Sequence, residues 1–345
     1  MASRLPLALI EEIFSRLPIK TLIRFRCLSK SWRATIGSQE FIKNYLKNSS
    51  HHNLILGNFN GSSDLVVDEV YFYSADYDFF LETDRAVFNE LSLPVRSRID
   101  LETDILGSCN GLLCVLSLWD DRPILWNPST REHPILLCAL EFRCPFTGGT
   151  WYTNYGFGDD SVGDDYKVVA IPVIYGKDDQ LAIGALHWVV KESSKSNSDK
   201  LIAAFDLGTE EFKLLQQPEY FDRHCDMRLG ILEGCLSLIC EYYKSHFDIW
   251  VMAEYGVQKS WTNLVSIKIC DLSTNCRLST SYPQAVKPIA YSKCSRRVLL
   301  GQANQLLLWY DIESISITYP VMQVTGAEQF FELGMFLQSL VKAQQ

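Results

Sequence analysis

The sequence lacks any apolar stretch long enough to cross a membrane as a helix. About 18 consecutive apolar residues are needed, and no run in this chain of 345 residues approaches that length. The first residues, MASRLPLALIEEIF, also lack a secretory signal, because the short apolar stretch runs into Glu11 and Glu12 without a small-residue cleavage site. We therefore expect no membrane association, and we expect a cytoplasmic protein, a nuclear protein or both.

Paired cysteine motifs are also missing. The chain has eleven cysteines, an odd number, and none of them forms a CxxC motif. The spacings of the nearest pairs, such as Cys109 with Cys114, are not those of zinc knuckles, and no regular histidine pairing accompanies them. In a reducing compartment such cysteines behave as small buried side chains. The sequence predicts no metal site and no cofactor.

Recognisable catalytic motifs are absent. The sequence contains no phosphate-binding P-loop, no nucleophile elbow and no HExxH zinc motif. Of the six histidines, His187 lies in the expected strand GALHWVV, where a structural role is the simpler interpretation. His224 precedes Cys225 directly, and adjacent side chains of a strand point to opposite faces. We expect a non-catalytic protein, and an uncharacterised enzyme remains an alternative.

An acidic segment, GFGDDSVGDDYKVV at 156–169, gathers four aspartates around Gly163. A calcium loop of the EF-hand type needs ligands at alternate positions and a distal glutamate, and this spacing does not supply them. The segment is better interpreted as a solvated hairpin tip between two strands.

Charge is unevenly distributed along the chain. Residues 1–47 carry nine Lys or Arg and three Asp or Glu, a net charge of +6, whereas the remainder has 23 cations and 38 anions, a net charge of −15. Such asymmetry suggests a basic head that meets an acidic partner, either a nucleic acid or an acidic protein. The acidic remainder disfavours broad contact with phosphates.

The basic head has the pattern of short helices. Pro6 suits the first position of a helix, and a one-sided apolar face follows at helical spacing: Ile10, Ile13, Phe14 and Leu17. Pro18 ends that helix and can open the next. Ser29 is a plausible N-cap for a third helix, and a fourth begins near Ser38. The apolar side chains of this head are too many for one small core, so we expect a partner to cover some of them.

The remainder of the chain has the pattern of short β-strands separated by turns. ILGSCNGLLCVLSL (105–118) pairs two apolar runs across an Asn-Gly turn. A weak repeat recurs in LWNPSTREHPIL (125–136), AFDLGTEEFKLL (204–215) and LWYDIESISIT (308–318), where Asn127 and Asp206 can close Asx turns. Recurring hairpins indicate a propeller-like array of small antiparallel sheets, with a sandwich as the competing fold. Only QFFELGMFLQSL, near the C-terminus, has a longer helical pattern.

The head resembles an F-box. LPLALIEEIFSRLPIKTLIRFRCLSKSW (5–32) has the F-box order of Leu-Pro, amphipathic helix, Leu-Pro, Lys-x-Leu, Arg-x-Arg and a final Trp. Residues 105 to about 311 resemble the F-box-associated domain (type 1, kelch-like) of the large plant F-box family, through GSCNGLLCV, LWNPSTRE, GFGDDSVGDDYKVV, GALHW, AFDLGTEEF, DIWVMAEYGVQKSWT and LLLWYD. The fold that this implies is α+β and multidomain, with an all-α F-box before an all-β, propeller-like domain.

The resemblance implies a role in protein ubiquitination. F-box proteins are similar in serving as substrate receptors of SCF (Skp–cullin–F-box) ubiquitin ligases, in which the F-box docks on the Skp adaptor and the C-terminal domain captures the target. The positions it assigns to facing or supporting the adaptor are Leu5, Pro6, Ile10, Ile13, Leu17, Pro18, Leu22, Arg26, Cys27, Leu28 and Trp32. Cullin and RING subunits would follow through the adaptor. The target protein and the residues that bind it are not indicated, and a DNA-binding regulator built on the basic head remains an alternative.

The expected domains are the F-box at 1–47, a connector with the first strands at 48–104, and the F-box-associated domain at 105–345. One departure from the family pattern lies at 175–186, where GKDDQLAIGA replaces a longer strand unit. We expect a missing or shortened hairpin there, which could leave a sheet edge exposed.

Overall fold

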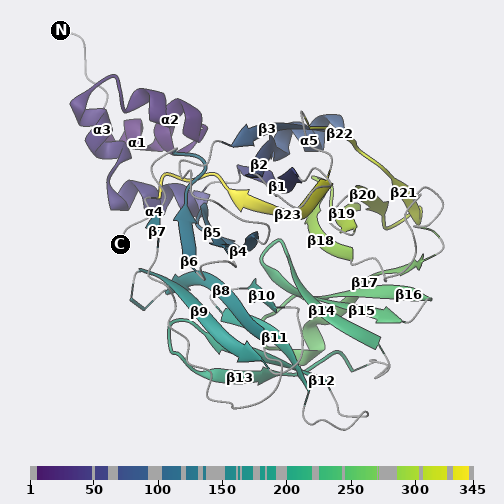
Figure 1. Cartoon of the computed structure of the whole chain (residues 1–345). Coiled ribbons are helices and arrows are strands. Elements are labelled where there is room, and N and C mark those ends of the chain that lie inside the picture. Colours follow the sequence, from purple (N-terminus) through teal and green to yellow (C-terminus); the bar gives the residue numbers. More distant parts are fainter. Residues whose placement is uncertain are drawn as a thin grey trace. The chain divides into compact units, whose positions relative to one another are not determined.

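The chain begins with four short helices and continues as antiparallel sheets in the computed structural model (Figure 1). Two compact units are present, one formed by Met1–Ala139 with Met322–Gln345 and the other by Leu140–Val321. The structure describes residues 6–48, 51–60, 69–91, 103–117, 122–130, 135–136, 152–160, 162–163, 165–173, 179–182, 185–191, 200–219, 225–242, 245–269, 271, 286–302, 306–324 and 329–341.

The predicted helices are present in the first unit. They are α1 (Leu7–Ser15), α2 (Ile19–Phe25), α3 (Lys30–Ile36) and α4 (Gln39–Asn48). Pro6 is the N-cap of α1 rather than its first residue, and Pro18 is the N-cap of α2. Ser29 caps α3 as predicted, because its hydroxyl accepts a hydrogen bond from the Trp32 backbone N–H at 3.0 Å. No helix in the described part of the chain is long and apolar enough to cross a membrane.

Four sheets are four-stranded antiparallel meanders whose strands follow chain order. They comprise β4 (Thr103–Cys109), β5 (Leu112–Ser117), β6 (Arg122–Trp126) and β7 (Ile135–Leu136); β10 (Asp179–Ala182), β11 (Ala185–Lys191), β12 (Lys200–Asp206) and β13 (Phe212–Leu215); β14 (Cys225–Leu232), β15 (Cys235–Tyr242), β16 (His246–Met252) and β17 (Trp261–Lys268); and β18 (Val286–Tyr291), β19 (Arg297–Gln302), β20 (Leu306–Asp311) and β21 (Ser316–Thr318). Such a meander is the blade of a β-propeller, and this order differs from the Greek-key order of a sandwich. The predicted fold class, a helical head followed by a propeller-like β domain, is confirmed.

The remaining strands form a five-stranded sheet and a two-stranded one. The first has the order β22 (Val321–Val324), β3 (Arg85–Leu91), β2 (Glu69–Asp76), β1 (His52–Asn60) and β23 (Gln329–Leu337), and helix α5 (Tyr77–Thr83) follows β2. The second pairs β8 (Tyr152–Asp160) with β9 (Asp165–Val173). In the described residues β8 and β9 have no further strand partners, and β9 directly precedes the 175–186 segment where a shortened hairpin is expected.

The hairpin turns use the side chains that the repeat predicts. Asn110 and Gly111 have φ of 50° and 81°, the left-handed pair that a two-residue hairpin needs. Asn127 accepts from the Ser129 N–H at 2.8 Å, Asp206 accepts from two backbone N–H groups at 2.9 Å, and Asp311 closes the turn after β20 in the same way. One short polar side chain therefore ends the third strand of three blades.

The acidic segment forms the predicted hairpin tip between β8 and β9. The Asp160 carboxylate accepts from the N–H groups of Val162 and Gly163 and pairs with Lys167 Nζ at 2.9 Å. These donors lower the pKa of Asp160, the backbone N–H of Gly163 most of all. Asp164 lies outside the described residues, among which no group of three or more His, Cys, Asp or Glu could hold a metal ion.

The helical pattern near the C-terminus is overruled by strand pairing. Residues 329–337 of QFFELGMFLQSL form β23, which runs antiparallel to β1 from His52 opposite Leu337 to Phe59 opposite Gln329. The segment mixes residues that favour strands and helices, and a short helix is only marginally stable without tertiary packing, whereas the edge of β1 pairs with the backbone of this segment along its length. The helix suggested there is wrong.

The residues after β23, 338–341, form a strap that holds the first unit together. The Gln338 N–H donates to His51 O at 2.8 Å, and Ser339 is fully buried. Asn127 Nδ2 donates to the backbone oxygens of Ser339 and Val341 at 3.1 and 2.8 Å. A Cβ on Gly111 would lie 2.2 Å from Ser339 Oγ, so only glycine fits beneath the strap.

Asn127 donates hydrogen bonds to the strap, which an aspartate at this position could not do. In Asn127→Asp the turn acceptor is kept, but a buried carboxylate replaces the donor facing two carbonyl oxygens. We expect a loss of about 3 kcal/mol in the free energy of unfolding, measured by urea denaturation. Asp206→Asn is the matched control, because it keeps the turn acceptor and introduces no buried charge, so we expect a smaller loss. Equal stability of the Asn127→Asp variant would contradict this reading of the strap.

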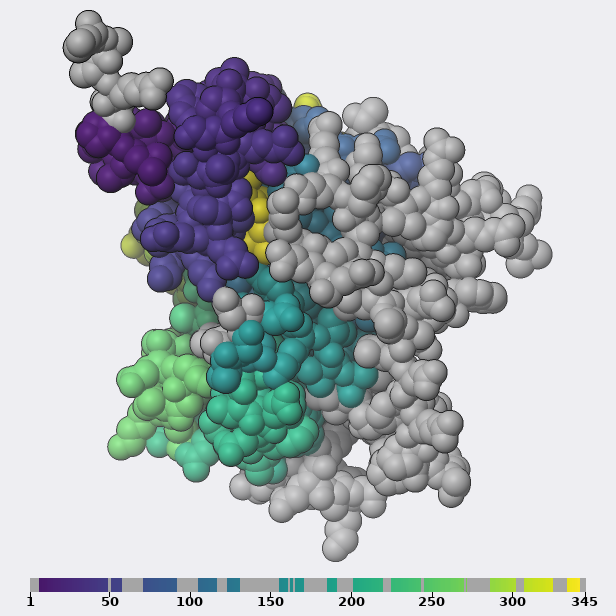
Figure 2. Space-filling model, turned by 90° about the vertical axis from the view of Figure 1, so that its left-hand side faces the viewer, coloured from purple at the N-terminus to yellow at the C-terminus, as the bar shows by residue number. Residues whose placement is uncertain are grey.

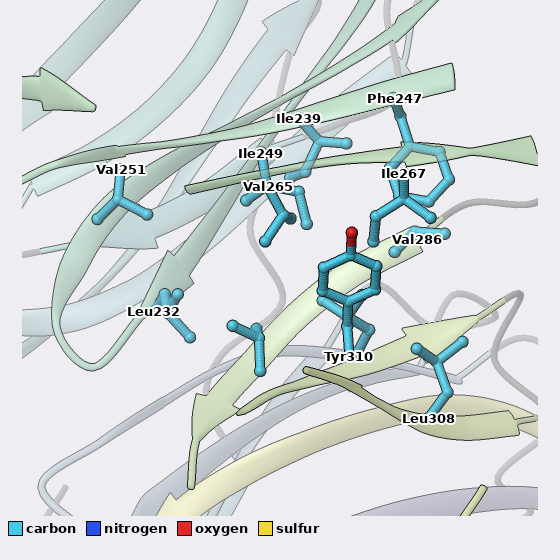
Figure 3. Close-up of a cluster of buried hydrophobic side chains, with 12 residues drawn as sticks. Leu232, Ile239, Phe247, Ile249, Val251, Val265, Ile267, Val286, Leu308 and Tyr310 are labelled. Atoms are coloured by element: carbon cyan, nitrogen blue, oxygen red, sulfur yellow. The ribbon is translucent and has the colours of Figure 1, made fainter. Parts of the chain in front are cut away.

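The second unit has an apolar core between two neighbouring blades. Side chains from β15, β16 and β17 meet side chains from β18 and β20, as Figure 3 shows. The cluster comprises Leu232, Ile239, Phe247, Ile249, Val251, Val265, Ile267, Val286, Val298, Leu300, Leu308 and Tyr310. Burial also raises the pKa of the Tyr310 hydroxyl. β-Branched residues dominate the cluster because they pack well on a pleated surface.

A charged group on this unit predicts acid sensitivity. The backbone N–H of Ser314, with help from Arg296 at 2.9 Å, lowers the pKa of Asp311 from 3.8 to about 2. Ionised Asp311 therefore stabilises the fold at pH above 3.8, and this contribution is lost as the pH falls through about 2. Asp311→Asn should be less stable than wild type at neutral pH, and the two should converge near pH 2. Thermal unfolding across pH checks this, with Glu254→Gln as the control; a constant difference would contradict it.

Candidate adaptor-binding surface

The helical head is organised around Phe14. Its ring meets the rings of Phe25, Trp32 and Phe41 at centroid distances of 5.7, 5.3 and 6.5 Å, the last two edge-on. Edge-on aromatic pairs gain from the quadrupoles of the rings as well as from burial. Tyr45 of α4 closes the core, and its hydroxyl donates to Leu17 O at 3.0 Å. These contacts fix the relative positions of all four helices.

The strap contributes a side chain to this core. Leu340 is buried among the residues of the head, in a cluster with Phe14, Ile19, Leu22, Ile36, Phe41 and Tyr45. Figure 2 shows the yellow C-terminal segment against the purple helices. The head is therefore anchored to the sheet of its own unit by residues that are far away in the sequence.

Several large apolar side chains of the head remain exposed to solvent. Ile13 is 50% exposed and Leu28 66% exposed, and Leu7 and Leu9 are also exposed. Leu9 and Ile13 are four residues apart on α1 and so share one of its faces. Leu28 lies in the turn between α2 and α3. As expected, the head has more apolar side chains than its own core can bury.

The structure places the predicted adaptor residues in three environments. Pro6, Ile13, Pro18, Cys27 and Leu28 are exposed; Ile10, Leu17, Arg26 and Trp32 are half-buried; and Leu22 is completely buried. Leu5 lies outside the described residues. Exposed members are available for contact, whereas Leu22 can only support the surface from beneath.

The predicted apolar face of α1 needs correction. Ile10, Ile13, Phe14 and Leu17 were expected on one side, but Phe14 is buried while Ile13 faces solvent. The helix LALIEEIFS is apolar on more than one side, so an apolar spacing does not identify the buried face. For the same reason Leu7 and Leu9 were not predicted as exposed apolar residues. The surplus of apolar side chains in the head was the signal that could have indicated them.

The head also exposes several cations. Lys20, Arg24, Lys30 and Arg33 are exposed on α2 and α3. Arg16 forms a pair with Glu12 at 2.7 Å, but both side chains are largely exposed, so the pair adds little stability. The surface combines apolar anchors with cations, which suits an acidic partner that is itself partly apolar.

The histidine considered for catalysis has a structural environment. His187 on β11 is completely buried, and its Nε2 lies 2.7 Å from the Tyr255 hydroxyl. Burial lowers the pKa of His187 to about 4, so the ring is neutral at physiological pH. A neutral ring that bonds a tyrosine from the β16–β17 loop ties two blades of the second unit together.

The same segments match known protein families. Residues 2–44 match the F-box domain, and residues 181–332 match the F-box associated beta propeller domain. The chain belongs to the F-box proteins that carry a C-terminal F-box-associated domain, as the resemblance predicted. Members of this family are substrate adaptors that are generally non-catalytic.

Relatives from Arabidopsis thaliana cover most of the chain. The F-box/kelch-repeat protein At3g23880 is 30% identical over 76% of this chain and 79% of its own length. F-box protein CPR1 is 28% identical over 98% of this chain and 88% of its own length. Among solved structures, apo AztD from Citrobacter koseri covers 86% of this chain and all of its own at 9% identity, with a TM-score of 0.42.

Two leucines of the head should respond differently to truncation. Leu22→Ala opens a cavity in the core, and we expect a loss of about 2–5 kcal/mol in the free energy of unfolding. Leu28→Ala, at an exposed position, should change it by at most about 0.5 kcal/mol. Urea denaturation of the intact protein measures both. A large destabilisation by Leu28→Ala would show that Leu28 belongs to the fold rather than to a free surface.

Proposed function

We propose that this protein is a substrate receptor of an SCF ubiquitin ligase. The helical head docks on a Skp-type adaptor, which connects it to cullin and RING subunits, and the β domain captures a target protein. The family match of the head supports the first part, and the family match of the blades supports the second. A cytoplasmic or nuclear location accords with this role.

The observation that carries the proposal is the exposed apolar surface on the F-box segment. Each of Leu9, Ile13 and Leu28 would contribute about 1–3 kcal/mol if a partner buried it fully. Water-exposed side chains of this size are costly to display together unless a partner covers them. The cations of α2 and α3 would accelerate docking and set its orientation on an acidic adaptor.

The receptor would act by proximity rather than by chemistry of its own. A target held on the β domain presents its lysines at high local concentration to ubiquitin carried by the other subunits. The protein would need no nucleophile, metal or cofactor for this.

Adaptor binding should depend on the exposed apolar residues of the head. We expect Ile13→Asp and Leu28→Asp each to weaken binding to a purified Skp-type adaptor by at least about tenfold, because a carboxylate would be buried at the interface. Isothermal titration calorimetry measures this. Val162→Asp, at a residue 74% exposed on the β8–β9 tip, is the matched control.

The outcomes separate the proposal from its competitor. Unchanged adaptor affinity in both head variants, with their folds intact, would overturn the docking surface. Binding of the wild type to a mixed DNA duplex, with a steep decline in affinity as salt rises, would instead favour the DNA-binding alternative.

A further inference from the structure

The outer strand β13 of the second unit differs from the outer strands of the next two blades along the chain. Residues Phe212 and Leu214 of β13 are 66% and 65% exposed. The corresponding strand β17 exposes Thr262, Asn263, Ser266 and Lys268, and β21 exposes Ser316 and Thr318. Polar side chains are the usual protection of a sheet edge. Strand β13 instead exposes the side chains of a phenylalanine and a leucine to solvent.

The two apolar side chains of β13 lie on the same face of the sheet. Phe212 pairs with Phe205 and Leu214 pairs with Ala203 on β12, two positions apart. Phe212 packs against Phe205 and Trp188 at centroid distances of 4.8 and 5.8 Å. These contacts hold the ring of Phe212 on one side and leave the other side exposed. Binding of a ligand there would therefore cost little side-chain entropy.

The backbone of β13 is open at the same residues. The Asp206 N–H donates to Glu211 O at 3.0 Å, and hydrogen-bonded pairs alternate along an antiparallel ladder. Lys213 and Leu215 therefore direct their backbone groups at β12, whereas Phe212 and Leu214 direct theirs away from it. In the described residues β13 ends its sheet, so these groups face an edge.

Acidic residues lie at both ends of this edge. Glu210 and Glu211 precede β13 and Glu219 follows it, and all three are exposed. Lys167 pairs with Glu210 at 2.7 Å. Lys213 is exposed in the middle of the strand, and by alternation it shares a face with Glu211, whereas Phe212 and Leu214 point to the other face. Three exposed acids therefore lie beside two cations at this edge, a small local excess of negative charge.

We propose that β13 is a docking edge for an extended, basic segment of a partner protein, which adds a strand to this sheet. Apolar side chains at alternate positions of that segment would pack beside Phe212 and Leu214. Lysines or arginines at its ends would meet Glu211 and Glu219. Backbone hydrogen bonds would supply affinity, and the two apolar contacts would supply selectivity. This assignment rests on the proposed function, since it names the kind of target segment that the β domain takes.

The test uses a synthetic peptide and the full chain. The probe is a fluorescein-labelled peptide of about seven residues, with Val at alternate positions, Thr between them and Lys at both ends. Fluorescence anisotropy measures its affinity. We expect Phe212→Ser and Leu214→Ser to weaken binding by about tenfold or more. Ile315→Ser, at a residue 71% exposed in the β20–β21 turn of another blade, should leave it unchanged.

Two altered peptides examine the mode of binding. A peptide N-methylated on the amides that would face β13 should not bind, because it cannot join the ladder. A peptide with Glu at both ends should bind more weakly, and Glu211→Lys should reduce this preference. Thermal unfolding verifies that the variants fold. Leu214→Ser keeps the test informative if Phe212→Ser is unstable, because Leu214 is 65% exposed and its truncation opens no cavity in the core.

Several results would overturn the docking edge. These are equal affinity of wild type and Leu214→Ser, unimpaired binding of the N-methylated peptide, or a dimer in sedimentation that Leu214→Ser dissociates, which would make a second copy the occupant. Adaptor titrations on the same variants separate the two proposals. If the protein binds the adaptor but not the peptide, only the docking edge is contradicted. If it binds the peptide but not the adaptor, only the proposed ligase role is contradicted.

Discussion

The pairing of β1 with β23 is the interaction on which the first unit depends. It joins residues 52–59 to residues 329–337, and so brings both ends of the chain into one sheet. The strap that follows then reaches the Asn110-Gly111 turn, the side chain of Asn127 and the core of the helical head. Leu340 is the point at which the head and the sheet share a core. The exposed face of the head is presented from a fixed base because of these contacts.

Two surfaces of this chain leave large apolar side chains in water, and the same physical reasoning applies to both. The head displays Ile13 and Leu28 among cations, and β13 displays Phe212 and Leu214 among acids. Each combines apolar anchors with an excess of one charge, so the head suits an acidic partner and the edge a basic one. The receptor role proposed for this protein would need two such surfaces with different preferences.

Local patterns predicted the elements whose causes are local. The N-cap at Ser29, the Asn-Gly turn at 110–111 and the Asx turns at Asn127 and Asp206 all depend on residues within a few positions. Errors arose where distant partners decided. β23 was expected to be helical. Helix α5 was also missed within the connector and first strands expected at 48–104, although its Asp76 cap is a local signal. The buried side of α1 was misassigned because both of its sides are apolar.

By itself the sequence determined the helical head, the repeated hairpins, the charge asymmetry and the family of this protein, because each is written in short runs and spacings. It also indicated the surplus of apolar side chains in the head. Only the tertiary structure decided which of them remain exposed, separating Leu22 from Leu28, and that Phe212 and Leu214 stand at a sheet edge. Exposure depends on which distant segments cover a residue, and no local pattern contains that information.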